Sequence, residues 1–304
     1  MMSKMLRLED YKPVEFEDKT VFDKHYKKYP PVHSDYVFTT LISWKEYANY
    51  HYVSYKNTIL IYSKINNQIR LRPPIGRRNK NIFDQVLKLA KKQNVDYPLG
   101  VIDVETKKWM KERYPGLVFK AHRGFFDYVY LTSDLAKLQG SRYSKIRNRV
   151  NKFKKNYHYS VEKISEENIP EVKKFLKHWY IYKNCESDVL LKNEKKAINY
   201  SMDHFFELEL SGIAVRVDDN IGAIAVYEKM NKDTAVVHYE KGSPYYDGIY
   251  KVVNQETAKI LQKSFKFINR ESDMGLPGLR RVKMSYRPHH MVKVYHIEKD
   301  SLTI

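Results

Sequence analysis

The feature that most constrains the fold is an order of elements that occurs twice along the 304 residues. Each copy reads as helix, three short strands, glycine-containing loop, amphipathic helix and one further strand. The first copy has a helix at 41–49, strands at 52–55, 58–62 and 69–72, a loop at 73–80, a helix at 82–90 and a strand at 100–104. The second has helices at 169–180 and 197–210, strands at 213–217, 222–227 and 235–240, a loop at 241–248, a helix at 250–261 and a strand at 265–269. This recurrence predicts two related α/β halves.

A strongly basic segment, 140–157, lies between the two copies and contains no Asp or Glu. At helical spacing its apolar residues form one stripe, namely Tyr143, Ile146, Val150, Phe153 and Tyr157. A cationic stripe runs beside it, formed by Arg142, Lys145, Arg149 and Lys152. We therefore predict halves at 1–139 and 140–304, the second opened by a basic helix at 141–157 that holds phosphate groups. A merely solvated helix face is the alternative.

The charge balance of the whole chain also points to polyanionic partners. Lysine and arginine total 55 against 36 acidic residues, a formal net charge of +19. Nucleic acid, an anionic membrane surface and phosphorylated ligands are all compatible with this excess. Cys185 is the single cysteine, which excludes an internal disulfide and fits a reducing compartment. No apolar run approaches the ~18 residues of a membrane span, so we expect a cytoplasmic protein that can touch a membrane surface.

Two regions of the second half carry candidate chemistry. The loop ending at Gly248 leads into a helix opened by Tyr250, Lys251 and Asn254, and helix N-termini bind anions. The loop at Gly76 has the same position in the first half. Neither matches a phosphate-binding fingerprint, so a plain connection is the alternative for each. Polar residues also follow the strand at 265–269, a common place for ligands in α/β folds. The histidines show no metal-ligand spacing, and we expect no metal.

Two separated motifs carry a family resemblance. The first comprises Asp127–Tyr130, Asp134-Leu135, Leu138, Gly140, Tyr143, Arg147-Asn148 and Phe153, and the second comprises Ile268–Glu271, Asp273–Gly275, Gly278–Arg280, Lys283, Ser285, Tyr286 and Pro288. Together they resemble the phosphatidylglycerol lysyltransferase C-terminal-like family, which is related to Fem-type aminoacyltransferases. The resemblance implies a tandem GNAT fold, in which each domain is a mixed, mostly antiparallel sheet flanked by helices. It also implies an acyltransferase that needs no cofactor and takes an aminoacyl group from aminoacyl-tRNA to a lipid headgroup or another amine or hydroxyl acceptor.

The expected site combines these residues. Glu240 is the candidate base, and Arg270 and Lys283 are the candidate oxyanion donors. The residues expected to bind the donor or substrate are Lys145, Arg147, Asn148, Arg149, Lys152, Gly248, Tyr250, Lys251, Asn254, Asn269, Glu271, Arg280 and Tyr286. Two alternatives stay open: a GNAT-type N-acyltransferase that uses acyl-CoA, and a non-catalytic protein that binds RNA or a membrane surface.

Overall fold

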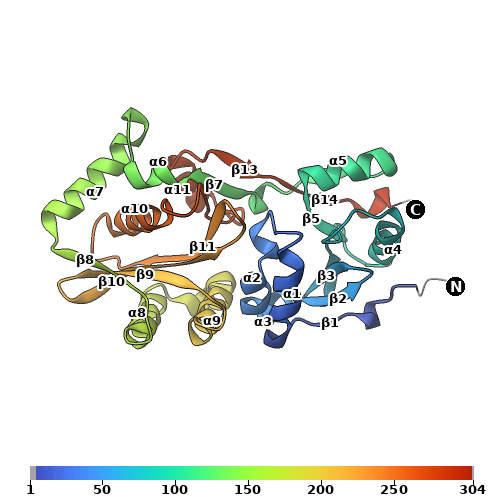
Figure 1. The fold of residues 1–304 in the computed structure, drawn as a ribbon, viewed down its shortest axis with the longest axis horizontal. Coiled ribbons are helices and arrows are strands. Elements are labelled where there is room, and N and C mark those ends of the chain that lie inside the picture. The colour runs from blue at the N-terminus through green and yellow to red at the C-terminus, as the bar shows by residue number, and fades with distance from the viewer. Residues whose placement is uncertain (1–4, 303–304) are drawn as a thin grey trace. The chain divides into compact units, whose positions relative to one another are not determined.

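The computed structural model describes residues 5–302, which divide into two compact units (Figure 1). The first unit extends to Phe126 and resumes at Val292, and the second comprises Asp127–Met291. The predicted halves met between 139 and 140. In the structure, the segment 127–139 packs in the second unit, and the last part of the chain returns to the first.

The first unit is built on a seven-stranded sheet of order β1-β2-β3-β4-β5-β14-β6. Its strands are β1 (Lys12–Pro13), β2 (His51–Tyr55), β3 (Thr58–Ile65), β4 (Gln68–Leu71), β5 (Leu99–Asp103), β14 (Val294–Ile297) and β6 (Phe119–Ala121). Its helices are α1 (Lys19–Tyr26), α2 (Phe38–Ser43), α3 (Lys45–Ala48), α4 (Lys80–Lys91) and α5 (Val104–Arg113). The meander β2-β3-β4 is antiparallel, and β4 pairs with β5 in parallel through the crossover helix α4.

The second unit repeats this plan in a sheet of order β13-β7-β12-β11-β10-β9-β8. Its strands are β7 (Asp127–Leu131), β8 (Tyr159–Lys163), β9 (Ser211–Val217), β10 (Asn220–Lys229), β11 (Thr234–Gly242), β12 (Phe267–Asn269) and β13 (His290–Val292). Its helices are α6 (Thr132–Lys137), α7 (Ser144–Asn156), α8 (Ile169–Tyr182), α9 (Val189–Asp203), α10 (Ile249–Leu261) and α11 (Pro277–Ser285). Figure 1 shows α10 on one face of this sheet and α8 and α9 on the other.

These two mixed sheets confirm the predicted pair of α/β domains and their repeated meander, helix and parallel strand. Two of the predicted helices differ most from the structure. The helix predicted at 41–49 is divided between α2 and α3, and α9 begins at Val189 and ends at Asp203, earlier than predicted at both ends. The basic helix α7 follows a single 3-10 turn and buries Ile146, Val150 and Phe153, which are three residues of the predicted apolar stripe.

A β-bulge in β11 prepares the candidate site. The pairing of β10 with β11 shifts at Val226/Tyr227, so that His238 is the extra residue between Val237 and Tyr239. Val237 belongs to the core beneath α10, and beyond the bulge Glu240 also reaches α10, where Asn254 contacts it. The parallel pairing of β11 with β12 covers only residues 234–236 and 267–269. Glu240 therefore lies on the part of β11 beyond its pairing with β12, and its side chain extends toward Arg270, the residue that follows β12.

Candidate functional site

The site is built around an ion pair between Glu240 on β11 and Arg270, which directly follows β12. Arg270 Nε donates to Glu240 Oε2 over 2.8 Å, and Nη2 donates to the same oxygen. Asn254 Nδ2, from α10, donates to Glu240 Oε1 over 3.3 Å. Both charged side chains are nearly buried, with 12% of Arg270 and 11% of Glu240 exposed. The pair is thus held in a low-dielectric setting, where hydrogen bonds to charge are strong.

Two tyrosine rings and a lysine surround this guanidinium. The Arg270 guanidinium carbon lies 4.9 Å from the ring centroid of Tyr286 and 5.8 Å from that of Tyr130. Lys251 Nζ lies 4.5 Å from the Tyr286 centroid. Burial, followed by the positive charge of Arg270, lowers the pKa of Lys251 to about 8, although Glu240 opposes this shift. Near neutral pH a useful fraction of this amine is therefore unprotonated and able to accept a proton.

Two buried polar atoms at this place have no hydrogen-bond partner among the described residues. They are Arg270 Nη1 and Asn254 Oδ1, which belong to the two side chains that contact Glu240. An unpaired buried donor or acceptor costs about 1–3 kcal/mol, so such atoms are rare in folded proteins. The site thus presents one strong donor and one acceptor that a bound polar group can satisfy.

Lys283 on α11 holds the segment after β12. Its ammonium donates to the carbonyl oxygens of Arg270, Glu271 and Ser272 over 2.5, 3.2 and 2.6 Å. Burial lowers the pKa of Lys283 to about 8. Because all three ammonium protons are directed at backbone carbonyls, the structure gives Lys283 the geometry of a support for Arg270.

Three other predicted residues also build the frame around Arg270. Asn269 Nδ2 donates to Asp127 Oδ2 over 2.8 Å, and Asn269 Oδ1 accepts from the Glu271 N–H over 2.7 Å. Arg280 forms a two-pronged pair with Asp273 at 2.8 and 3.1 Å, and this pair with further hydrogen bonds outweighs burial and lowers the pKa of Asp273 to about 2. These residues thus shape the turn that presents Arg270.

Sequence reasoning missed a residue in this frame, His238. Its Nδ1 lies 2.8 Å from Glu271 Oε1 and its Nε2 lies 2.8 Å from Glu228 Oε1, while 3% of its side chain is exposed. Burial opposes the charged imidazolium, but the two hydrogen bonds outweigh it and raise the pKa of His238 to about 10. Its position depends on the bulge in β11, which no local sequence pattern announces.

We expect His238→Gln to lower the free energy of unfolding by about 3 kcal/mol at pH 6.5, because two carboxylates lose the cation between them. The folded pKa exceeds the ordinary value of about 6.5, so the stabilising contribution is fully present below that pH and is lost as pH rises through about 10. Urea unfolding at pH 6.5, 8 and 10 should therefore show the gap to the wild type closing. The exposed His178→Gln is the control. If the difference in free energy of unfolding between the wild type and His238→Gln does not change with pH, the His238 imidazole is not the charged group that stabilises the fold.

The basic helix α7 meets the start of α10 near this site. Gly248 has φ +94°, and a Cβ there would lie 3.0 Å from the Arg149 carbonyl oxygen, so the two backbones approach closely. Asp247 forms ion pairs with Arg149 at 3.3 Å and Lys152 at 3.1 Å. The charge of Arg149 also contributes to the lowered pKa of Lys251. The predicted basic stripe and the residues around Arg270 are thus connected through the first turn of α10.

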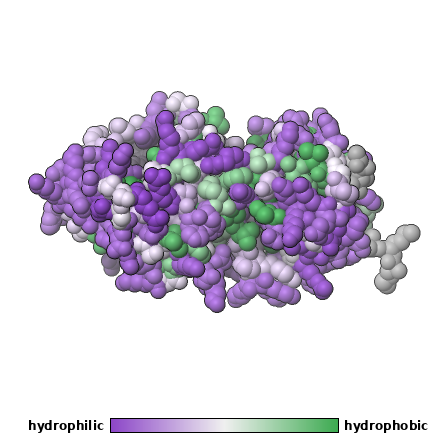
Figure 2. All heavy atoms as spheres, turned by 90° about the horizontal axis from the view of Figure 1, so that it is seen from above, coloured by the Kyte–Doolittle hydropathy of each residue, from purple (hydrophilic) through white to green (hydrophobic). Residues whose placement is uncertain are grey.

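Two of the other predicted binding residues are exposed, and two are hydrogen-bonded within the protein. Lys145 and Asn148 are exposed on α7. This helix lies at one end of the second unit, and Figure 2 shows hydrophilic side chains covering that end. Arg147 instead donates to the carbonyls of Leu138 and Gly140 over 2.6 and 3.0 Å. The Tyr250 hydroxyl accepts from Trp179 Nε1 over 3.2 Å. Lys145 and Asn148 therefore remain available to a ligand, whereas Arg147 holds the turn that precedes α7.

The chain matches a known protein family over most of its length. The family described as phosphatidylglycerol lysyltransferase, C-terminal, matches residues 26–298. An uncharacterised protein of Mycoplasmoides gallisepticum is 23% identical over 193 residues, which are 63% of this chain and 61% of that protein. The chain thus matches somewhat less than two thirds of this curated relative. Among residues 5–302, no helix is long and apolar enough to span a membrane.

Solved structures share the fold across almost the whole chain. A conserved Bacteroides thetaiotaomicron protein of unknown function is 26% identical with a TM-score of 0.88, covering 95% of this chain and 98% of its own. A C-terminal domain assigned to a lysylphosphatidylglycerol synthetase of Agrobacterium fabrum is 13% identical with a TM-score of 0.66, covering 94% of each chain. FemX is 12% identical with a TM-score of 0.53, covering 96% of this chain and 98% of its own.

Proposed function

This chain belongs to the phosphatidylglycerol lysyltransferase C-terminal family, and on that premise we propose that it transfers an aminoacyl group from aminoacyl-tRNA to an amine or hydroxyl acceptor, with a lipid headgroup as the favoured acceptor. The observation that carries the proposal is the pair of unsatisfied buried atoms, Arg270 Nη1 and Asn254 Oδ1, beside an amine whose pKa is about 8. Acyl transfer requires a donor for the developing oxyanion and a group that moves one proton. These residues supply both.

The proposed reaction starts when the acceptor nitrogen or oxygen attacks the carbonyl carbon of the aminoacyl ester. Arg270 Nη1 donates to the oxyanion of the tetrahedral intermediate, while neutral Lys251 takes the proton that the acceptor loses. The carbon–oxygen bond to the tRNA ribose then breaks, and Lys251 returns the proton to the departing ribose oxygen. The step needs no oxidant, reductant or metal ion.

The remaining predicted catalytic residues act in this proposal through Arg270. Glu240 Oε2 is bound twice by the guanidinium, so we assign Glu240 to positioning Arg270 and assign the proton transfer to Lys251. Lys283 binds the carbonyl oxygens of residues 270–272 and thereby fixes the backbone from which the Arg270 side chain extends. The exposed cations of α7 would bind the phosphates of the tRNA donor.

The role of Lys251 has a pH signature. At pH 7 about one tenth of an amine with a pKa near 8 is neutral, so we expect kcat/KM to rise about tenfold per pH unit below pH 8 and then to level off. The measurement is initial transfer from labelled aminoacyl-tRNA between pH 6 and 8.5, corrected for spontaneous ester hydrolysis.

Lys251→Met should lower the rate by about 10²–10⁴-fold and abolish this rising limb. The exposed Lys263→Met, just beyond the end of α10, should keep both the rate and the profile of the wild type. A Lys251→Met enzyme with the wild-type pH profile would show that another group moves the proton.

A further inference from the structure

Two exposed tyrosine rings meet where the end of α8 lies beside the loop between β11 and α10. Tyr245, in the loop 243–248, is 79% exposed, and Tyr182, the last residue of α8, is 53% exposed. Their ring centroids lie 6.1 Å apart, with the ring planes inclined by 60°. A single exposed aromatic residue is ordinary, whereas neighbouring exposed rings form a patch, and such patches mark interaction surfaces.

The surface around this tyrosine pair carries positive charge. Lys183 Nζ lies 5.5 Å from the Tyr182 ring centroid. Residues 177–185 contain two lysines and no acidic residue, and Glu186, which follows them, is paired with two lysines of α9. Exposed aromatic rings beside cations are the arrangement that binds single-stranded nucleic acid, because the rings stack on bases and the cations attract phosphates.

The loop 243–248 joins the tyrosine pair to the basic helix α7. Tyr246, next to Tyr245, packs edge-on against Tyr157 at the end of α7, with ring centroids 5.4 Å apart. Asp247 forms ion pairs with two cations of α7. The helix α10 begins directly after this loop and carries Lys251 in its first turn. One short loop thus connects the phosphate-binding surface proposed for α7, the exposed rings and the reaction site.

We propose that Tyr182 and Tyr245 stack the unpaired bases at the 3′ end of the tRNA donor, an inference that rests on the transfer reaction proposed for this unit. The aminoacyl ester is carried by the last nucleotide of that single strand, so the strand has to run from the phosphates held by α7 to Lys251. A stacking surface beside this route holds the strand without reading its sequence, because every base presents a π-face. The cations of α7 alone supply only contacts to phosphates.

The test is fluorescence anisotropy of the full chain with two dye-labelled, uncharged RNA hairpins that share one stem. One hairpin ends in four unpaired 3′ nucleotides, and the other has a blunt end. At 0.1 M salt the unpaired end should strengthen binding to the wild type by about 10- to 100-fold. Tyr182→Ala with Tyr245→Ala should remove most of this gain and leave the affinity for the blunt hairpin unchanged. Tyr182→Phe with Tyr245→Phe should keep the gain, because the ring and not the hydroxyl stacks.

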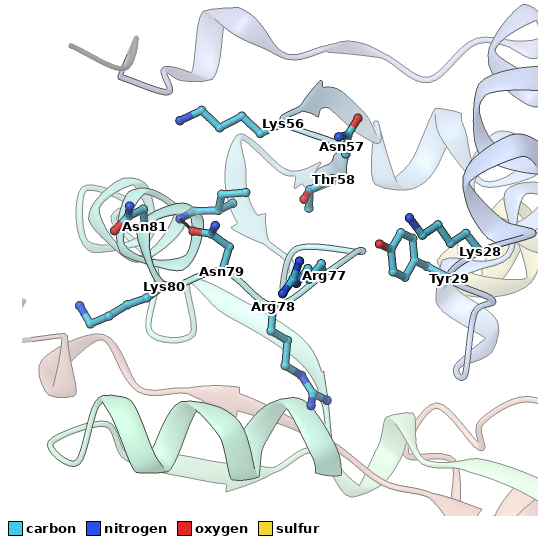
Figure 3. Close-up of a pocket in the computed structure, with 11 residues that line it drawn as sticks. Lys28, Tyr29, Lys56, Asn57, Thr58, Arg77, Arg78, Asn79, Lys80 and Asn81 are labelled. Atoms are coloured by element: carbon cyan, nitrogen blue, oxygen red, sulfur yellow. Dashed lines mark hydrogen bonds between the residues drawn. The ribbon is translucent and has the colours of Figure 1, made fainter. Parts of the chain in front are cut away.

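Two control variants change the first unit instead. Tyr47→Ala removes a tyrosine that is 37% exposed on α3, and it should bind both hairpins like the wild type. Arg77→Gln with Arg78→Gln removes two exposed cations from the pocket that Figure 3 shows. This variant should weaken binding of the two hairpins by the same factor, since it lowers the net charge and leaves the stacking rings in place. Thermal unfolding of each variant checks that the fold is retained.

Three outcomes would overturn the proposal. The wild type could bind both hairpins equally, or the alanine double variant could keep the preference for the unpaired end. The third is a double variant that loses affinity for phosphatidylglycerol vesicles alone, which would make this surface, with Ile181 66% exposed beside Tyr182, a membrane contact. Hairpin binding requires no transfer, so a failure of stacking leaves the reaction untouched. A chain that shows the stacking preference but transfers nothing would reject the reaction alone.

Discussion

Replacing Arg270 with lysine is expected to reduce the rate of aminoacyl transfer by about 10²–10³-fold, the cost of losing one oxyanion donor. Lysine keeps the positive charge beside Glu240 but cannot present Nε, Nη1 and Nη2 in the fixed fork that the guanidinium provides. The loss should appear in kcat with little change in KM, because the interaction forms in the transition state. Single-turnover and steady-state transfer from labelled aminoacyl-tRNA measure the two parameters.

The matched control for this variant is Arg216→Lys. Arg216 on β9 also forms carboxylate pairs, with Glu171 at 2.6 Å and Glu162 at 2.9 Å, but it contacts none of the residues around Arg270. We expect it to transfer at nearly the wild-type rate. Equal rates for the two variants, at equal thermal stability, would mean that Arg270 is a structural residue and not the oxyanion donor.

The second large effect concerns donor binding by α7. Changing Lys145, Arg149 and Lys152 to glutamine should flatten the slope of log affinity for tRNA against log salt by about 2–3, since each phosphate contact contributes about 0.7–0.9. Asp247 already forms ion pairs with Arg149 and Lys152, so we expect the change in slope to be closer to the lower value of this range. Filter binding between 50 and 300 mM salt measures this slope.

A second triple variant separates a specific surface from overall charge. Lys173, Lys174 and Lys177 are exposed on α8, and their change to glutamine removes the same three charges. If both triple variants have the same affinity and slope, tRNA responds to the net charge of +19 and α7 is not its site. A reduced slope for the α7 variant alone supports the proposed donor surface.

Periodicity was sufficient to predict the amphipathic helices, because each places its apolar residues on one face, whereas β9 and β10 are buried on both faces and read as continuous apolar runs. The apolar stripe of α7 and the buried face of α4 illustrate the helical pattern. The pairing of β14 with β5 was not predictable, since it joins residues nearly 200 positions apart and no local pattern specifies it. For that reason the predicted second half extended to residue 304, whereas the second unit ends at Met291.

The candidate site was predictable in part. Glu240, Arg270, Asn254, Lys251 and Tyr286 were named from strand ends and motifs, and the structure brings them together. The role of each residue depends on its neighbours in the folded structure. The lowered pKa of Lys251 comes from burial and from Arg270, which is distant in sequence. The three hydrogen bonds from Lys283 to backbone carbonyl oxygens depend on the turn after β12. Neither can be read from residues adjacent in sequence.

Aminoacyl transfer to a lipid is tested most directly by incubating the protein with tRNA charged with a mixture of labelled amino acids and with vesicles that contain phosphatidylglycerol. We expect the purified chain to release label from tRNA and the label to appear in the lipid extract, with both reduced by about 10²–10³-fold in Arg270→Lys. A wild-type protein that leaves the charged tRNA intact under these conditions but consumes acyl-CoA would show that aminoacyl-tRNA is not its donor.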